Sequence, residues 1–299
     1  MRSLTFLIIF SLSYLSIYAQ EEFINYEKDT EWMKKLSSMN GADRNDANIE
    51  FTSDRFFQTY QTSIIKIDYN PILDKHINKY LSYKWLPKVI GLLEYYRPLF
   101  ENKLKEYGLP FELILLPIVE SNLNPQAKSP VGAMGLWQFM PSTGKQYGLT
   151  KNDKVNLFFD PYASTDSACQ FLSYLYKELK DWNLVLAAYN SGLGRVQSAL
   201  KKARTNNFWV VRQYLPQETQ AYVPTFHAIK YIYKNYNFLY KSLPSLKYSF
   251  SSVKEVTVQK DTTFKELSQE LRINLQTLYF LNPHLTSEFI PKNSFVYCL

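Results

Sequence analysis

Apolar residues recur at helical spacing over most of this chain. Between residues 71 and 248, one stripe holds Ile72, Ile77 and Leu81, and a second holds Val89 and Leu93. Further helices are predicted over residues 165–182, 184–189 and 218–236. No convincing strand pattern interrupts them. The sequence therefore predicts a mainly α domain over residues 70–245.

Residues 252–299 follow a different pattern. Val253, Val256 and Val258 alternate with polar residues, two short helical patterns follow, and the chain ends in the apolar run "FVYCL". This β-α-α-β order predicts a small second domain. The intervening "LPSLKYSFSS" is expected to be a linker that contributes nothing to the helical core, so a cut near Ser251 should leave the helical domain folded.

The N-terminal residues are typical of a secretory signal. Arg2 precedes an apolar run from Leu4 to Ile17, and Ala19 precedes a polar, acidic start. We expect residues 1–19 to be a signal peptide cleaved after Ala19, with a retained anchor as the alternative. Residues 20–69 are predicted to be a polar extension, and the protein is expected to be exported to the periplasm or cell envelope of a bacterium.

Charge and composition narrow the function classes. The formal net charge is +7. Basic clusters such as "KKAR" are more often a polar helix face, and the alternative is an anionic polymer, which for an exported protein would be cell wall rather than nucleic acid. The two cysteines are far apart, and the three histidines are isolated, so no disulfide scaffold and no metal-ligand spacing is present. We expect a monomer with no metal and no cofactor, and peripheral association with the envelope stays open.

Glu120 is the first candidate for chemistry. It ends the apolar run "FELILLPIV" and stands before "SNLNP", near the expected C-terminus of a helix that begins after Pro110. Desolvation and the negative end of a helix dipole both raise the pKa of a carboxyl group, and a protonated glutamic acid near neutral pH is a general acid. An exposed residue at an ordinary turn is the equally weighted alternative.

Three later motifs could line a groove. In "GLWQFMP", Trp137, Phe139 and Met140 are expected to pack inward and leave the amide of Gln138 free to bind a sugar. "AYNSG" places Tyr189 and Asn190 at a helix end, and "ETQAYV" places Glu218 and Tyr222 on one helix face. Taken singly, each is more simply a hydrophobic turn, a helix C-terminus or a helix start.

Together the motifs are far more specific. "ESNLNP", "GLWQFMP", "AYNSG" and "ETQAYV", in this order, resemble the lysozyme-like lytic transglycosylases of bacterial cell walls, and "GLPFELILLPIVES" resembles their membrane-bound D branch. The resemblance covers about residues 70–236. It implies a lysozyme-like helical fold that acts on peptidoglycan glycan strands and cleaves the β-1,4 bond between N-acetylmuramic acid and N-acetylglucosamine. Trp137 stands where the family often has Met.

The resemblance also implies the roles of individual residues. Glu120 matches the single catalytic acid of the family. The residues matched to substrate binding are Ser129, Gln138, Tyr189, Asn190 and Tyr222.

The C-terminal unit resembles a LysM peptidoglycan-binding module. "KDTTFKELSQEL" matches the start of its first helix, and "LNPHL" matches the exit from its second. Lys260 and Asn293 replace glycines of the usual pattern. Because Asn tolerates left-handed backbone, the fold is expected to persist, while sugar binding stays open.

The carboxylate count favours a transglycosylase. No Asp or Glu occurs from Ser121 through Asn152, so Glu120 would act first as acid and then as base and form a 1,6-anhydro sugar. A lysozyme- or chitinase-type hydrolase would need Asp160 or Glu218 as a second carboxylate. A non-catalytic peptidoglycan-binding protein is the remaining alternative, which the intact Glu120 disfavours.

Overall fold

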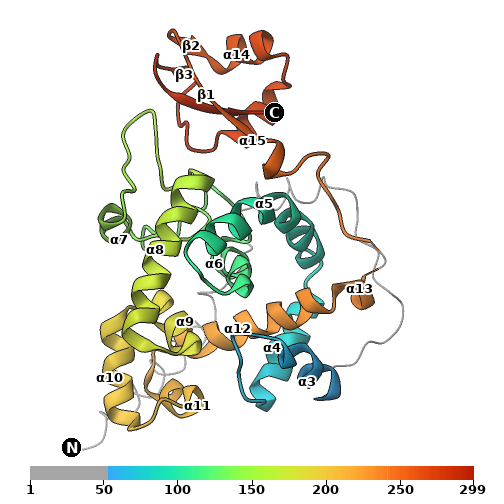
Figure 1. Ribbon diagram of the computed structural model, residues 1–299, viewed down its shortest axis with the longest axis vertical. Helices are drawn as coiled ribbons and strands as arrows, with labels where there is room; N and C mark the ends of the chain where they lie inside the picture. The colour runs from blue at the N-terminus through green and yellow to red at the C-terminus, as the bar shows by residue number, and fades with distance from the viewer. Residues whose placement is uncertain (1–52, 241) are drawn as a thin grey trace, which may run out of the picture.

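The computed structural model describes residues 53–240 and 242–299, and it confirms the mainly α prediction (Figure 1). The predicted signal, residues 1–19, and most of the predicted extension lie outside the described residues. The α-helices are α3 (Ser53–Gln61), α4 (Pro71–Ser82), α5 (Leu86–Glu106), α6 (Leu116–Ser121), α7 (Pro141–Gln146), α8 (Pro161–Leu179), α9 (Trp182–Ser191), α10 (Leu193–Ala203), α11 (Phe208–Val211), α12 (Gln217–Lys234), α13 (Tyr236–Leu239), α14 (Phe264–Leu271) and α15 (Leu275–Leu281). Short 3₁₀ helices are η3 (Phe111–Leu115), η4 (Arg212–Tyr214) and η5 (Phe250–Ser252).

Helix boundaries follow local sequence signals. Asp160 caps α8 by accepting a hydrogen bond from the amide of Ala163, and Asp181 caps α9 through Leu184. Helix α12 carries Tyr222 and lies against α4, α6 and α9 in the centre of the helical body (Figure 1). No helix of the described residues has the length and apolarity needed to cross a membrane.

The C-terminal unit has the predicted order, with two extra short strands. Its strands are β1 (Lys254–Thr257), β2 (Thr262–Thr263), β3 (Phe289–Ile290) and β4 (Phe295–Cys298). Strand β1 pairs antiparallel with β4, and β2 pairs antiparallel with β3. Asn293 has a φ of 66°, so it adopts the left-handed geometry expected of it.

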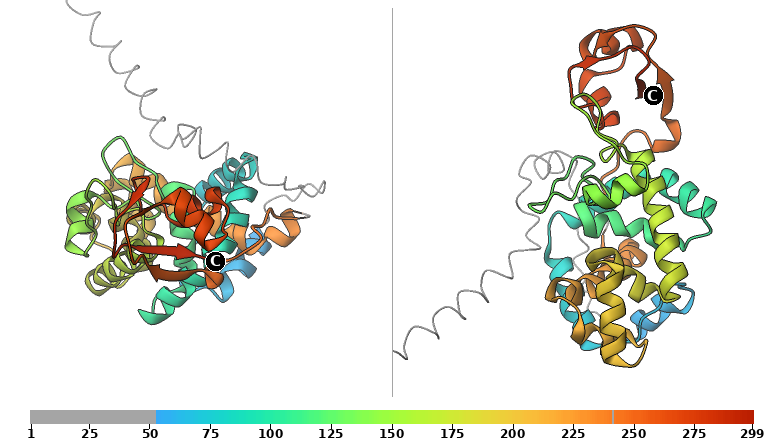
Figure 2. Two further views of the ribbon diagram at one scale, coloured as in Figure 1. Left: turned by 90° about the horizontal axis from the view of Figure 1, so that it is seen from above. Right: turned by 90° about the vertical axis from the view of Figure 1, so that its left-hand side faces the viewer.

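The expected linker is packed against the helical body, which corrects the prediction of an uninvolved tether. A Cβ at Gly91 in α5 would collide with the carbonyl oxygen of Pro244. Farther along, Tyr95 of α5 makes ring contacts with Tyr248 and Phe250, at centroid distances of 5.8 and 5.9 Å. The apolar residues of "LPSLKYSFSS" pack against the main hydrophobic core, and Figure 2 shows the C-terminal unit at one end of the helical body.

The helical body also begins before residue 70, the predicted domain boundary. Phe56 of α3 and Ile65 are at most 1% exposed and belong to the main hydrophobic core. The buried Lys230 of α12 donates a hydrogen bond to the carbonyl oxygen of Ile65, and Glu112 accepts one of 2.8 Å from the amide of Ile64. Long-range polar contacts anchor this segment, and local periodicity does not reveal them.

Candidate active site

Glu120 is the only residue of α6 that is not buried. Leu116, Ile118 and Val119 of the same helix are at most 4% exposed, whereas Glu120 is partly exposed. The apolar run therefore holds α6 inside the core, because burying its side chains is favourable. Glu120 is thus the residue at which this helix reaches the surface, while its carboxyl group stays largely desolvated.

The backbone beyond Glu120 is strained. Asn122 and Leu123 have φ values of 51° and 59°, and left-handed geometry costs about 1–2 kcal/mol for most residues. The turn is held by a 3.1 Å bond from the Leu123 amide to the Pro117 carbonyl and a 2.9 Å bond from the Ser121 hydroxyl to the Leu136 carbonyl. Strain that the surroundings enforce in this way is typical of functional sites.

The surroundings of Glu120 favour its protonated form. Burial raises the pKa of Glu120 to about 8, the hydrogen bond from Tyr222 opposes this shift, and the negative charge of Glu218 adds to it. At neutral pH the group is mostly a carboxylic acid. The direction of this pKa shift agrees with the expectation from the sequence, and the role of Glu120 as a general acid stays a prediction.

Two tyrosines from separate helices lie beside this acid. The hydroxyl of Tyr222, in α12, donates a hydrogen bond to Oε1 of Glu120. Tyr189, at the end of α9, donates one of 2.8 Å to the carbonyl oxygen of Trp137. Burial raises the pKa of Tyr189 well above its ordinary value, and the charge of Glu120 adds to the shift. The phenol of Tyr189 therefore stays protonated and acts as a donor.

Asn190 connects the second carboxylate to the site. Its Nδ2 donates a 3.2 Å hydrogen bond to Oε1 of Glu218, and its Oδ1 accepts one of 2.7 Å from the hydroxyl of Thr219. Glu218 is exposed and is close enough to influence Glu120. From the sequence, Glu218 was interpreted as a helix-start residue or a second carboxylate, and Thr219 of the same "ETQAYV" motif was missed.

Gln138 and Ser129 lie on the loop that follows α6. Gln138 is partly exposed with a φ of 47°, and its Nε2 donates a 2.9 Å bond to the carbonyl of Gly135. Nε2 also donates a 3.4 Å bond to the carbonyl of Ala127, so the donor side of this amide is occupied, contrary to the free amide expected from the sequence. Ser129 accepts a 2.9 Å bond from the amide of Ala133 and lines a pocket.

The inward packing predicted for this loop is partly confirmed. Trp137 is fully buried and donates a 2.9 Å bond to the hydroxyl of Thr165, and Phe139 is 3% exposed. The same prediction for Met140 was wrong, since this side chain is 40% exposed. Met140 immediately precedes Pro141, the first residue of α7, and its side chain lies on the surface instead of in the core.

Asp160, the other candidate for a second carboxylate, is occupied elsewhere. It is 1% exposed, caps α8 through a 2.7 Å bond from the amide of Ala163, and accepts bonds of 3.1 and 3.2 Å from the hydroxyl of Tyr297. Nδ1 of His284 lies 3.5 Å away. Both oxygens therefore serve the contact between α8 and the C-terminal unit.

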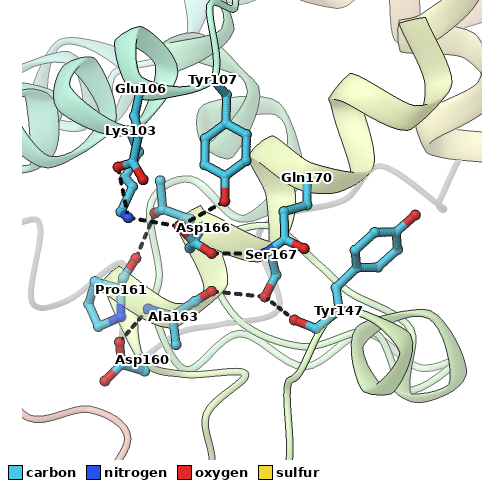
Figure 3. A network of polar contacts seen from close by, with 11 residues as sticks. Lys103, Glu106, Tyr107, Tyr147, Asp160, Pro161, Ala163, Asp166, Ser167 and Gln170 are labelled. Carbon is cyan, nitrogen blue, oxygen red and sulfur yellow. Dashed lines mark hydrogen bonds and ion pairs between the residues drawn. The ribbon is translucent and has the colours of Figure 1, made fainter. Parts of the chain in front are cut away.

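The start of α8 is also tied to α5 (Figure 3). Nζ of Lys103 lies 2.7 Å from Asp166 and 3.0 Å from Glu106, and Tyr107 and Gln170 donate further bonds to Asp166. Hydrogen bonds from Lys103 and Gln170 lower the pKa of Asp166 against the effect of its burial. This network is structural. No cluster of His, Cys, Asp or Glu suited to a metal ion occurs in the described part of the chain.

Comparison with known proteins finds similar sequences. Residues 97–211 match the family model of the transglycosylase SLT domain, and the helical part of the chain that contains them is called the SLT domain below. The match includes Glu120, Ser129, Gln138, Tyr189 and Asn190, and it ends before Tyr222.

Individual relatives carry the same family name. The chain is 42% identical over 163 residues to membrane-bound lytic murein transglycosylase D of Escherichia coli K12. The aligned region covers 52% of this chain and 36% of that protein. The chain is 32% identical over 122 residues to the soluble lytic murein transglycosylase of the same organism, covering 38% of this chain and 19% of that protein. The chain thus spans about a third, or less, of the length of these relatives.

A solved structure also aligns. The 70 kDa soluble lytic transglycosylase of Escherichia coli matches with a TM-score of 0.44 and 24% identity, over 56% of this chain and 30% of that one.

Proposed function

We propose that this protein is a peptidoglycan lytic transglycosylase that cleaves the β-1,4 bond between N-acetylmuramic acid and N-acetylglucosamine. The observation that carries the proposal is the environment of Glu120, a carboxylic acid at the surface of an apolar helix with a tyrosine donor on its carboxyl group. The SLT domain match and the murein transglycosylase relatives support the substrate class.

Glu120 would act twice in the reaction. It first gives its proton to the glycosidic oxygen as the bond from that oxygen to C1 of muramic acid breaks. The C6 hydroxyl oxygen of the same sugar then bonds to C1, and its proton passes to the Glu120 carboxylate. No water is consumed, and Glu120 regains its starting form. Tyr222 would stabilise the intermediate carboxylate, since a hydrogen bond to a charged group is stronger than one to a neutral group.

The other groove residues are proposed to hold the glycan. Asn190 and Gln138 present amide groups, Ser129 a hydroxyl, and Tyr189 an aromatic ring, and such groups suit sugar hydroxyls and faces. Tyr189 is held by its hydrogen bond to the carbonyl oxygen of Trp137, and Asn190 by its hydrogen bond to Glu218.

A hydrolase is the second candidate, because Glu218 lies near enough to raise the pKa of Glu120. Hydrolysis would need Glu218 to activate water or to act as a nucleophile. Its exposure and its bond to Asn190 instead favour a role in orienting that amide.

The reaction product separates the two candidates. A transglycosylase digest of purified peptidoglycan should release muropeptides ending in 1,6-anhydro-N-acetylmuramic acid, each lighter by one water than the hydrolase product. Mass spectrometry of the released fragments measures this directly. Reducing ends throughout the digest would establish hydrolysis and refute the transglycosylase proposal.

Tyr222→Phe should raise the pKa of Glu120 above about 8, because it removes the bond that favours the ionised form. The alkaline limb of the activity profile should therefore move to higher pH, while turnover falls about 10- to 100-fold from the lost bond to a charged group. The pH dependence of kcat measures both effects. Tyr189→Phe is the matched control, because it loses only the hydrogen bond to the carbonyl of Trp137. If the alkaline limb of the Tyr189→Phe profile moves as far as that of Tyr222→Phe, Tyr222 does not set the pKa of Glu120.

Location and wall binding are proposed on the same basis. The protein would act in the bacterial envelope, in line with its murein transglycosylase relatives. Export through the N-terminal signal, a monomeric state and glycan binding by the LysM-like residues 252–299 stay predictions.

A further inference from the structure

A pocket of about 600 Å³ lies where the C-terminal unit meets the SLT domain. Its walls come from four segments: the loop around Ser129, Pro141 at the start of α7, the loop of residues 151–159, and Thr286 of the C-terminal unit. The buried side chains of Met134 and Phe159 contribute apolar surface to it. The pocket is therefore built jointly by both parts of the chain.

The C-terminal wall is fixed by backbone contacts. The amide of Thr286 donates a 2.9 Å bond to the carbonyl of Lys154, and its hydroxyl donates one of 3.2 Å to the carbonyl of Asp153. Two residues along from Lys154, the amide of Asn156 donates a 2.8 Å bond to the carbonyl of His284. This ladder holds residues 151–159 against the C-terminal unit, so the pocket has a preformed shape.

The charged groups of the pocket suit a short peptide with more carboxylates than amines. Lys128 and Lys151 are exposed on its walls, and the single carboxylate among the lining residues is Asp153. Nζ of Lys128 lies 5.5 Å from the ring centroid of Phe159, which places its charge over the apolar wall. A carboxylate bound there would meet an ammonium group, and an amine could pair with Asp153.

The position of Ser129 links this pocket to the glycan. Ser129 lines the pocket and is also one of the residues assigned to the glycan groove. Muramic acid carries its stem peptide on a lactyl group, and this peptide is short and rich in carboxylates. A strand bound beside Ser129 would therefore hold a stem peptide at the mouth of the pocket.

We propose that this pocket binds the stem peptide of the peptidoglycan strand, so that the C-terminal unit completes the substrate site of the SLT domain. The inference rests on the proposed function. It assigns Lys128, Lys151 and Thr286 to recognition of the peptide, and it predicts that strands with stem peptides bind more tightly than bare glycan strands.

Binding in the Glu120→Gln background tests this without turnover. Soluble strands with stem peptides are compared with the same strands after an amidase has removed the peptides, and the ratio of the two Kd values is measured by calorimetry. The unmodified pocket should prefer the strands with peptides. Lys128→Glu/Lys151→Glu should lower that preference at least about tenfold, the equivalent of ~1.4 kcal/mol.

Lys145→Glu is the matched control, since Lys145 is an exposed lysine of α7 outside the pocket. It should keep the preference, and thermal unfolding of all three proteins should coincide. Equal Kd values for the two kinds of strand, an unchanged preference in the double variant, or an equal loss in Lys145→Glu would overturn the inference. None of these outcomes bears on the anhydro product, which tests the proposed function separately.

Discussion

The Glu120→Gln protein should fold and bind peptidoglycan yet lose about 10²–10⁴-fold in kcat, the range for removal of a general acid. Gln has nearly the same shape as Glu and can still accept the hydrogen bond from Tyr222, but it has no proton to give to the glycosidic oxygen. The release of soluble muropeptides from sacculi measures turnover, and sedimentation with sacculi measures binding.

Glu218→Gln is the matched control for this loss. It removes the other carboxylate near Glu120 while keeping an acceptor for Asn190, so we expect no more than about a tenfold decrease, as for an exposed hydrogen bond that is weakened by the loss of charge. A loss in Glu218→Gln as large as that in Glu120→Gln would favour the two-carboxylate hydrolase. Near-normal activity of Glu120→Gln would refute the catalytic assignment.

The same substitution should change how stability depends on pH. The pKa of Glu120 is raised to about 8 in the folded protein, whereas the unfolded value is near 4.5, so between these values the folded state binds more protons. The contribution of Glu120 to the free energy of unfolding therefore decreases as pH rises through this window. Glu120→Gln does not titrate, and its Tm relative to the original protein should increase from pH 4.5 to pH 8.

Local patterns predicted the parts of the fold that local forces determine. The helical periodicity of α4, α5, α8, α9 and α12, and the β-α-α-β order of the last residues, appear in the structure near the expected positions. Glu120 could be singled out because an acid at the end of a buried apolar run needs an explanation. The left-handed Asn293 follows from the tolerance of Asn for that geometry.

Contacts between distant residues could not be predicted in this way. Tyr222 meets Glu120 across 102 positions, and only the packing of α12 on α6 brings them together. Periodicity likewise gave no sign that Ile65 is held by Lys230, or that Asp160 serves Tyr297 instead of catalysis. In each case the local sequence predicts an exposed polar side chain, because the partner that allows its burial lies far along the chain.

The linker shows the same limit. A flexible linker was predicted for "LPSLKYSFSS" because this segment is short, partly polar and contains Pro. Its aromatic residues instead pack on Tyr95 and Tyr96 of α5. Apolar residues spaced irregularly in a loop can bury as much surface as those in a helix, and only the folded chain shows which surface they cover.

Removal of residues 252–299 should therefore destabilise the SLT domain, contrary to the expectation from the sequence. The cut uncovers Tyr95, which is 3% exposed and has the ring of Phe280 5.1 Å from its own, and it leaves the buried Asp160 without Tyr297. Losing buried aromatic contacts and the partner of a buried carboxylate together costs on the order of 5 kcal/mol. We expect a marked decrease in Tm or insoluble protein, measured by thermal unfolding of the two purified chains.

Tyr297→Phe in the full chain separates the polar contact from the covering surface. It removes only the hydrogen bonds to Asp160 and keeps the ring, so we expect a loss of about 1–3 kcal/mol, less than that of the truncation. If the truncated chain instead unfolds at the same temperature as the full chain, the C-terminal unit is a tethered module, and its contacts with α5 and α8 contribute nothing to the stability of the SLT domain. If the truncated chain has a lower Tm than the full chain, truncation damages the SLT domain as well as removing the LysM-like unit. Weaker binding of the truncated chain to peptidoglycan could then not be assigned to the loss of the LysM-like unit alone.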